Sequence, residues 1–485
     1  MFSSELWQKS GVSTYSIDQS IRFNQADNAS MSRTPSSASN KRTWTFSWWW
    51  KRGALSGSTN GTNQRQPIFG TTAFSILSNH NSTQIDGINV VYTGAANDVQ
   101  TSEKFRDVSA WYNFQAVLDT TNDVASERFR LYKNGQRITD FASISYPAKD
   151  TEYTVNNTQA HYIGLRSSGE NLDGYLAEIV FIDGQALTPS SFGEENDNGI
   201  WIPKDVSGLT FGTNGFWIDG RDSSDLGDDE SGQGNDFTAS GLAAHDQMTG
   251  ESPTNNFCVL NPILNMTHQY LTADIRDTNL ASQAVSASLN NYAIGSMGVT
   301  SGKWYFEAEY PTYPALSGAR VGFISLENAS SNIGGSSYGK EKTILLSNRH
   351  TTSAFSNFEW GNGSSYPNTS ATSQTPFVQD DIIGVAFDCD NSTIQFYKNG
   401  STFGSQFDYS AQSNAVDTSD GDTYAPIIMG DNTNYTNKVV LNFGQDSTFN
   451  GGTSAGGNSD GNGIGNFKYS VPSGYLALCT KNLGS

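Results

Sequence analysis

Apolar and polar residues alternate along most of the chain in short runs, which are separated by clusters of Gly, Asn, Ser and Asp. Trp44, Phe46, Trp48 and Trp50 occupy every second position, which is the period of a strand that buries one face. We expect this tryptophan-rich run to be core packing with one ring on the outer face. Such patterns recur at intervals of roughly 8–15 residues, and long helical stripes are absent. The pattern therefore predicts an all-β fold of two antiparallel β-sandwich domains of the jelly-roll type.

The tetrapeptide Tyr-Lys-Asn-Gly occurs twice, ending at Gly135 and at Gly400. Each copy follows a run with the alternation of a half-buried strand, at residues 128–132 and 393–397. Asn-Gly after such a run favours a tight hairpin, because a type I′ turn needs positive φ at both central residues. We therefore predict that the same type of hairpin occurs in each of the two sandwiches. The repeat then reflects a shared fold rather than an active site.

Composition narrows the classes of function. Charged residues make up 16% of the 485 residues, below the usual ~25%, and aromatic residues make up 12%. This profile fits a turn-rich all-β protein with real cores. The formal net charge of −20 argues against nucleic acid as a partner and against binding to anionic membrane surfaces.

The first 20 residues lack the basic and apolar regions of a signal peptide, and no run is long enough to cross a bilayer, so we expect no membrane insertion. Cys258, Cys389 and Cys479 are widely spaced and form no metal-binding knuckle or disulfide framework. These features predict a chain that is made and folded in a reducing cytoplasm.

Three segments of the first 200 residues carry a family resemblance. Residues 48–52 end a Trp-rich strand in Lys-Arg, and residues 111–135 run from a Trp strand to a Tyr-x-Asn-Gly hairpin. Residues 163–192 contain Ile-Gly, Asp-Gly-Tyr-x-Ala-Glu, Leu-Thr-Pro and a closing Phe. Together they resemble the laminin G-like, concanavalin A-like jelly rolls. The resemblance implies a jelly-roll domain over residues 1–205.

Residues 206–250 differ in character, because they are acidic and rich in Gly. We interpret them as a connector with one strand near residues 216–218 and an Asp-rich loop. The spacing of an EF-hand is missing, which favours a solvated loop, although a structural calcium ion there is left open.

Residues 251–485 carry a second set of motifs. They are Gly-Lys-Trp-Tyr-Phe-Glu from 302, Val-Gly at 321–322, Asp-x-Ile-Gly-Val-x-x-Asp from 381, the second Asn-Gly hairpin, a Pro-containing strand at 424–430 and Asn-Phe-Gly from 442. In this order they resemble the SPRY domain, a bent β-sandwich. The joint arrangement, with the opening that leads to residues 32–35 and 41–47, also resembles proteins of marine bacteriophages of the virion or tail-fibre type. That resemblance implies a role on the virion surface, while a fold alone does not fix function.

Catalytic patterns are not evident, so we predict no enzyme and no catalytic residues. Sandwich glycosidases place paired carboxylates on one strand face, but Glu178 and Asp183 are spaced for opposite faces. Glu307 and Glu309 share a face but belong to the SPRY strand pattern, and they lack a third carboxylate. The five histidines show no metal or triad spacing. A hydrolase with carboxylates scattered over distant loops stays as the less favoured alternative.

The long segment at residues 347–376 mixes aromatic with amide and hydroxyl side chains, which are the groups that bind sugars. Its candidate ligand-binding residues are Phe355, Phe358, Trp360, Asn362 and Tyr366. The competing interpretation is that Phe358 and Trp360 form one more core strand.

The sequence thus supports two hypotheses. In the favoured one, the chain is a bacteriophage virion surface protein, a host-recognition adhesin that binds a cell-surface glycan or receptor through sandwich loops. In the alternative, it is a non-enzymatic structural decoration or fibre protein of the capsid or tail. Both imply other virion proteins as partners, several copies or a homo-oligomer on the particle, and no cofactor.

Overall fold

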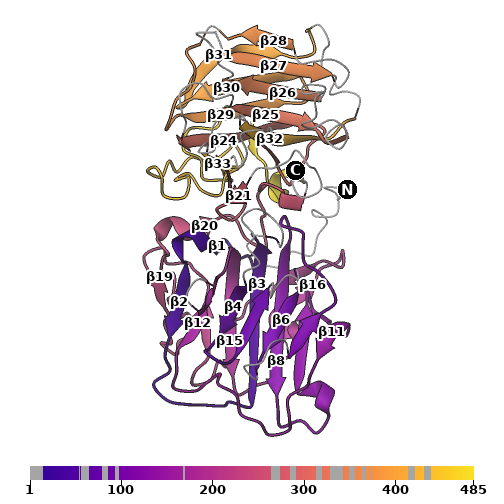
Figure 1. The fold of residues 1–485 in the computed structure, drawn as a ribbon, viewed down its shortest axis with the longest axis vertical. Helices are drawn as coiled ribbons and strands as arrows, with labels where there is room; N and C mark the ends of the chain where they lie inside the picture. The colour runs from indigo at the N-terminus through magenta and orange to yellow at the C-terminus, as the bar shows by residue number, and fades with distance from the viewer. Residues whose placement is uncertain are drawn as a thin grey trace. The chain divides into compact units, whose positions relative to one another are not determined.

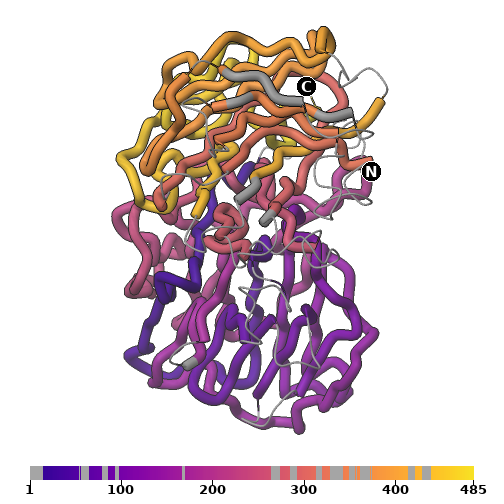
Figure 2. The backbone as a smooth tube through the Cα atoms, turned by 45° about the horizontal axis from the view of Figure 1, so that its top comes forward, coloured from indigo at the N-terminus to yellow at the C-terminus, as the bar shows by residue number. Residues whose placement is uncertain are grey.

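The fold is taken from a computed structural model of the 485-residue chain (Figure 1). The structure describes residues 15–53, 55, 65–78, 86–92, 98–167, 170–263, 274–283, 291–312, 319–327, 342–348, 356–362, 368–372, 374–412, 421–430 and 438–484. These residues form two compact units: those up to Asn256 belong to unit 1, and those from Phe257 to Leu483 belong to unit 2. The path of the chain through each unit can be followed in Figure 2.

Unit 1 contains two large antiparallel sheets. Its first sheet has the order β10 (Gln136–Arg137), β9 (Phe129–Lys133), β8 (Trp111–Asp119), β3 (Thr43–Arg52), β15 (Gly174–Asp183), β1 (Gln19–Phe23) and β20 (Gln247–Thr249), and β18 (Phe216–Ile218) also pairs with β15. Its second sheet has the order β11 (Phe141–Ile144), β7 (Val99–Thr101), β6 (Ile88–Val91), β5 (Ser75–Ser78), β4 (Gln66–Gly70), β12 (His161–Ile163), β2 (Ser30–Arg33) and β19 (Thr238–Ser240). Two small ribbons flank them, β13 (Leu165–Ser167) with β14 (Glu170–Asn171), and β16 (Gly193–Glu195) with β17 (Trp201–Pro203).

The core of unit 1 lies between these sheets. Strand β3 turns Trp44, Phe46, Trp48 and Trp50 into it, as their alternation predicts, and each of these rings is at most 1% exposed. Phe46 of the first sheet stacks on Phe69 of the second at 4.5 Å between ring centroids. A sandwich therefore forms because both sheets turn large apolar side chains toward one another.

Unit 2 is also built from two large sheets. The first has the order β21 (Asp274–Arg276), β22 (Ala281–Gln283), β33 (Lys438–Asn442), β24 (Lys303–Thr312), β29 (Ile382–Asp388), β30 (Thr393–Lys398) and β31 (Ser401–Asp408), with the short β34 (Leu476–Ala477) parallel to β24. The second has the order β23 (Asn291–Ile294), β32 (Tyr424–Gly430), β25 (Arg320–Ser325), β26 (Lys342–Ser347), β27 (Asn357–Asn362) and β28 (Asn368–Ala371). Phe323 of the second sheet stacks on Phe387 of the first at 4.1 Å between ring centroids, so the sheets pack face to face.

Helices are few and short among the described residues. They are η2 (Gln25–Asp27), η3 (Ala125–Glu127), η4 (Pro189–Ser191), η5 (Ala244–Asp246) and α3 (Thr480–Leu483). No helix within the described ranges is long and apolar enough to span a membrane. The predicted fold class, all-β with antiparallel sandwiches, is confirmed.

The predicted domain limits differ from the structure at residues 206–250, which we interpreted as a connector. This segment supplies β18 and β20 to the first sheet of unit 1 and β19 to the second. The next residues also belong to unit 1, so unit 2 starts at Phe257 rather than at 251. The predicted strand at residues 216–218 is present as β18. Strands β19 and β20 were not predicted, because three residues are too few to show alternation within an Asp- and Gly-rich stretch.

Three ion pairs are buried within the part of unit 1 that the structure describes, and all six of their side chains are at most 2% exposed. They are Arg22 with Asp246, Lys51 with Glu251, and Arg52 with Asp86, at N–O distances of 3.0, 3.0 and 2.7 Å. Two of these pairs join strands β1 and β3 to residues 246–251. These two ion pairs thus attach residues 246–251 to β1 and β3, the strands that the chain contributes first to this sheet.

The repeated tetrapeptide forms the same hairpin in both units. Asn134 and Asn399 adopt φ of 45° and 50°, and the following glycines adopt 76° and 78°. The Asn134 side chain accepts a hydrogen bond from the backbone of Asn113 at 2.8 Å. The Asn399 side chain does the same for Ile382 at 2.9 Å. Each asparagine therefore also holds the start of the neighbouring strand.

An aromatic ring from a later segment covers each of these glycines. A Cβ at Gly135 would overlap the ring of Trp201, and a Cβ at Gly400 would lie 2.7 Å from the ring of Tyr469. The hairpins thus need glycine both for positive φ and for the close approach of a ring.

Gly135→Ala tests this double requirement, with Gly199→Ala as the matched control in the same unit. Gly199 also has positive φ (73°), but a Cβ there would meet nothing within 4 Å. We expect the control to lower the free energy of unfolding by roughly 1 kcal/mol through φ alone, and Gly135→Ala by about 2–4 kcal/mol because the methyl group also meets Trp201. Urea unfolding measures both, and equal losses would contradict the packing role of Trp201.

Candidate functional site

The structure corrects part of the predicted ligand site at residues 347–376. Phe358 and Trp360 lie in β27, paired between β26 and β28, and they are only 7% and 4% exposed. Asn362 ends the same strand. Phe355 and Tyr366 lie outside the described residues, so their assignment as ligand contacts stays a prediction.

Both β27 aromatic side chains pack into the core of unit 2. Phe358 stacks on Phe407 with 4.7 Å between ring centroids, and Trp360 packs against the same ring at 5.0 Å. The sequence allowed two interpretations of these aromatic residues, a core strand and an exposed loop, and the structure shows the core strand. The strand forms because the apolar side chains of β27 face the first sheet of unit 2.

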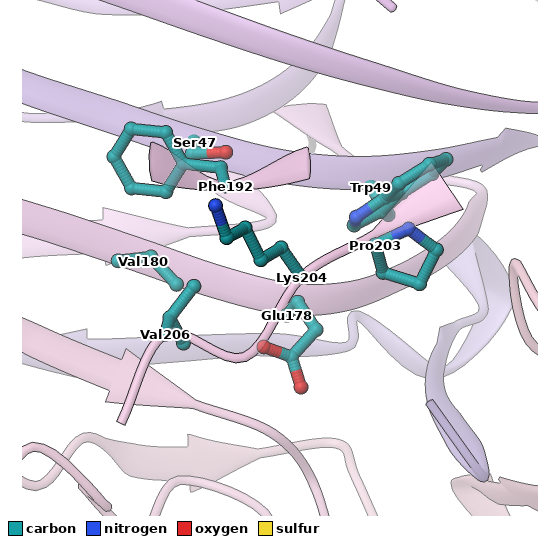
Figure 3. A pocket seen from close by; sticks show the side chains of 8 residues that line it. All are labelled: Ser47, Trp49, Glu178, Val180, Phe192, Pro203, Lys204 and Val206. Atoms are coloured by element: carbon teal, nitrogen blue, oxygen red, sulfur yellow. The ribbon is translucent and has the colours of Figure 1, made fainter. Parts of the chain in front are cut away.

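A hollow on the outer face of the first sheet of unit 1 is the stronger structural candidate (Figure 3). It lies where residues 187–206 return across the sheet. Its lining residues come from β3, β15 and this returning segment, and they are Ser47, Trp49, Glu178, Val180, Phe192, Pro203, Lys204 and Val206. Figure 3 shows the side chain of Lys204 lying across the hollow. The empty volume is about 190 Å³ when the part open to solvent is included, and no enclosed space is large enough for a water molecule.

Glu178 is the one acidic side chain in this lining. Its carboxyl accepts a hydrogen bond from the Tyr15 hydroxyl at 2.8 Å and another from the Trp217 indole N–H at 3.0 Å. Burial raises the pKa of Glu178 from 4.5 to about 8, with a further increase from the nearby Asp219 carboxylate. The two hydrogen bonds from Tyr15 and Trp217 oppose this shift, because they favour the charged form.

A β-bulge places Glu178 in the hollow. The pairing of β15 with β3 shifts register between Ala177 and Val180, and Glu178 adopts φ of 46°. Positive φ is uncommon for a residue other than glycine and costs free energy, so such positions are often functional. The sequence names Glu178 as a carboxylate but does not predict this hollow, because alternation along β15 gives no sign of a bulge.

A lone carboxyl with a raised pKa could act as a general acid. Glycoside hydrolysis needs two carboxyls on either side of a substrate, and no second acidic residue lines this hollow. In the parts of the chain that the structure describes, no group of three or more His, Cys, Asp or Glu side chains is arranged to hold a metal ion. What the structure shows for this carboxyl is a hydrogen bond that holds Tyr15 against the sheet.

Unit 2 has a comparable buried carboxyl at Glu307 in β24. It accepts hydrogen bonds from the backbone N–H groups of Lys468 and Tyr469, both at 2.9 Å, and from Asn442 at 3.2 Å. Burial raises the pKa of Glu307 to about 7. These contacts attach the Gly-rich segment that follows β33 to the outer face of the sheet, which is a structural role.

The Asp-rich loop of unit 1 also uses its buried carboxylate internally. Asp229 accepts hydrogen bonds from the backbone N–H groups of Trp217, Ser231 and Asn235, at 2.8 to 3.0 Å. The structural calcium ion that the sequence left open for this loop stays a hypothesis.

Comparison with protein-family models matches residues 303–446 to the SPRY domain. Comparison with curated proteins finds no match. Solved structures with partial similarity include the SPRY domain of human HERC1, with 19% identity, a TM-score of 0.25 and coverage of 33% of this chain and 87% of that chain. A putative carbohydrate-binding protein from Bacteroides ovatus has 15% identity, a TM-score of 0.34 and coverage of 49% and 62%.

A heptameric SAP-like pentraxin from Limulus polyphemus has 16% identity to the chain, a TM-score of 0.27 and coverage of 36% of this chain and 78% of that chain. These three TM-scores are all below 0.5, so the likenesses carry no argument about function. The SPRY match covers unit 2 from β24 to the end of β33 and agrees with the six motifs found there.

Glu178→Gln tests the buried carboxyl through the pH dependence of stability. Because the folded pKa of Glu178 is raised from 4.5 to about 8, the stability of the wild-type chain should fall as the pH rises through this range, since the buried group is forced to ionise. The glutamine variant keeps a neutral side chain and should be more stable than the wild type at pH 9 by about 3–5 kcal/mol, with little difference at pH 5.

Urea unfolding of unit 1 between pH 5 and pH 9 measures the effect. Glu195→Gln, a change at an exposed glutamate in the same unit, serves as the control and should leave the profile unchanged. Parallel pH profiles for the wild type and Glu178→Gln would show that Glu178 is not held neutral.

Proposed function

We propose that the chain is a non-enzymatic recognition protein on the surface of a bacteriophage virion. In this proposal it is a host-attachment adhesin that binds a cell-surface glycan or receptor through loops at the ends of its sandwiches. The observation that carries the proposal is the SPRY match over residues 303–446, because SPRY domains are interaction modules. Rigid sandwiches that present loops of variable sequence are suited to recognition.

The buried carboxyls support a binding role over a catalytic one. Glu178 and Glu307 combine raised pKa values with burial, which is often a sign of catalysis. Both are occupied by hydrogen bonds that attach other segments of the same chain. A hydrolase would need at least one such carboxyl to face an open cleft beside a second one.

The assignment to a virion rests on the sequence resemblance to marine bacteriophage proteins. Other virion proteins would then be partners, and several copies would be displayed on one particle. Multiple copies would compensate for weak single sites through effective concentration. A purely structural decoration or fibre protein of the capsid or tail is the second candidate, and it shares the predicted location but not the ligand.

A cell-binding experiment separates these candidates. The purified chain should bind host cells, and it should inhibit adsorption of the phage in proportion to its concentration. Immunogold labelling should also place it on the particle. Presence on the particle without cell binding would favour the structural candidate, and absence from the particle would refute both.

At residue level, Tyr366→Ala and Trp360→Ala make a matched pair. If Tyr366 is a ligand contact, its removal should weaken binding about tenfold with an unchanged melting curve, since an exposed aromatic contact contributes roughly 1–2 kcal/mol. Trp360→Ala should instead destabilise unit 2 by about 3–5 kcal/mol, because its ring is in the core. Unchanged binding in Tyr366→Ala would remove this segment as the receptor site.

A further inference from the structure

Three side chains of unit 1 meet at the end of β3, and their functional groups are of the kinds that can form a covalent bond with one another. The Lys51 amine lies 2.5 Å from the side-chain oxygen of Asn256 and 3.0 Å from Oε2 of Glu251. Lys51 and Glu251 are both 0% exposed. A primary amine and a carboxyl that are fully buried are thus in contact with a carboxamide that is partly buried.

We propose that Lys51 and Asn256 form an intramolecular isopeptide bond, with Glu251 as the catalytic acid–base residue. Lys51 Nζ attacks Cγ of Asn256, and a C–N bond forms while the bond from Cγ to Nδ2 breaks. The nitrogen of the asparagine side chain leaves as ammonia. The reaction needs no oxidant, reductant or other co-reactant, because an amine and an amide give an amide and ammonia.

Glu251 is placed to move the proton that this step requires. Its Oε1 accepts a hydrogen bond from the Trp111 indole N–H at 2.8 Å, which leaves Oε2 directed at Lys51. The carboxylate can take a proton from the Lys51 ammonium, which frees the lone pair of the amine. The departing Nδ2 of Asn256 donates a hydrogen bond to the Ser109 carbonyl, and in the proposed step the protonated Glu251 supplies the proton with which this nitrogen leaves as ammonia.

The surroundings favour the reaction for two physical reasons. The amine and the amide are held in contact by the fold, so the step is effectively unimolecular, and such positioning can supply a large part of a barrier. The Tyr175 ring lies 5.6 Å from Lys51 Nζ, and Trp111 packs against Tyr175. These rings help to exclude water, which would otherwise compete for the polarised carbonyl.

The choice of residue types also distinguishes this cluster from a purely structural ion pair. The other two buried pairs of unit 1 use arginine, at Arg22 and Arg52, which is the usual cation for buried pairing and cannot act as a nucleophile. Among these three pairs, only this one has a lysine as the cation, and the carboxamide oxygen of Asn256 approaches that lysine. Neutralising the negative charge of Glu251 would require only the lysine, so an ion pair alone does not account for the asparagine beside it.

The bond would join the end of β3 to the last residue of unit 1. The two linked residues are 205 positions apart in the chain. A pulling force that enters from unit 2 would then pass directly from residue 256 to β3. Residues 206–255 would not carry it, and unfolding them would not lengthen the chain between these points. This inference does not depend on the proposed ligand or host.

Intact mass spectrometry of the full chain tests the proposal. The wild type should weigh less than its sequence by one ammonia, and digestion should yield one branched peptide that joins Lys51 to Asn256. Lys51→Arg and Asn256→Ala should have the full mass. Glu251→Gln should form the bond at least about a hundredfold more slowly during refolding, as expected for loss of a general acid–base group.

Lys41→Arg is the control, because Lys41 pairs with Glu152 at the surface and should not affect the bond. The wild-type mass is decisive even if a variant fails to fold. The full sequence mass in the folded wild type would overturn the proposal. So would an ammonia loss that persists in Lys51→Arg, since this would indicate a succinimide at an asparagine rather than a cross-link.

Discussion

A charge that is removed from water inside the first sandwich must keep its partner, and this constraint shapes unit 1. Arg22 in β1 and Lys51 in β3 are buried, and their partners Asp246 and Glu251 come from the last part of the unit. Loss of Asp246 would leave the Arg22 cation in a site of low dielectric, at a cost of about 3–5 kcal/mol. The first strands of the sandwich therefore depend on residues that follow them by 200 positions or more, and residues 206–256 are part of the domain.

The requirement that buried polar groups have partners also explains which segments cover the outer faces of both sandwiches. Glu178 holds Tyr15 and Trp217 on one sheet, and Glu307 holds residues 468 and 469 on another. Trp201 and Tyr469 cover the two hairpin glycines from segments that arrive later in the chain. Each sandwich thus carries a third layer of irregular chain that is fixed by a buried carboxyl and an aromatic ring. This layer covers part of the outer face of one sheet in each sandwich.

The sequence predicted features that local patterns specify. The alternation of Trp44 to Trp50 gave the core face of β3, and the two Asn-Gly turns gave the hairpins, because both depend on residues close in sequence. Of the three short strands in residues 206–250, β18 was predicted at residues 216–218, but β19 and β20 were missed, since their pairing partners lie far away and their composition resembles a loop. Trp360 could not be assigned to core or ligand site, because both uses need an aromatic residue among polar ones. The position of Glu178 in the hollow was not predicted, because a bulge shifts the register without a sequence signal, and Lys51, Glu251 and Asn256 meet only in three dimensions.

Comparison of two fragments tests most directly whether residues 206–256 are integral to the first sandwich. Fragments 1–256 and 1–205 would be expressed separately, and their thermal unfolding would be followed by circular dichroism and tryptophan fluorescence. The account predicts one cooperative transition for 1–256. For 1–205 it predicts a chain without fixed tertiary structure, because Arg22 and Lys51 would be left buried without partners and β18, β19 and β20 would be missing. A cooperative transition of 1–205 at the same temperature as that of 1–256 would contradict it.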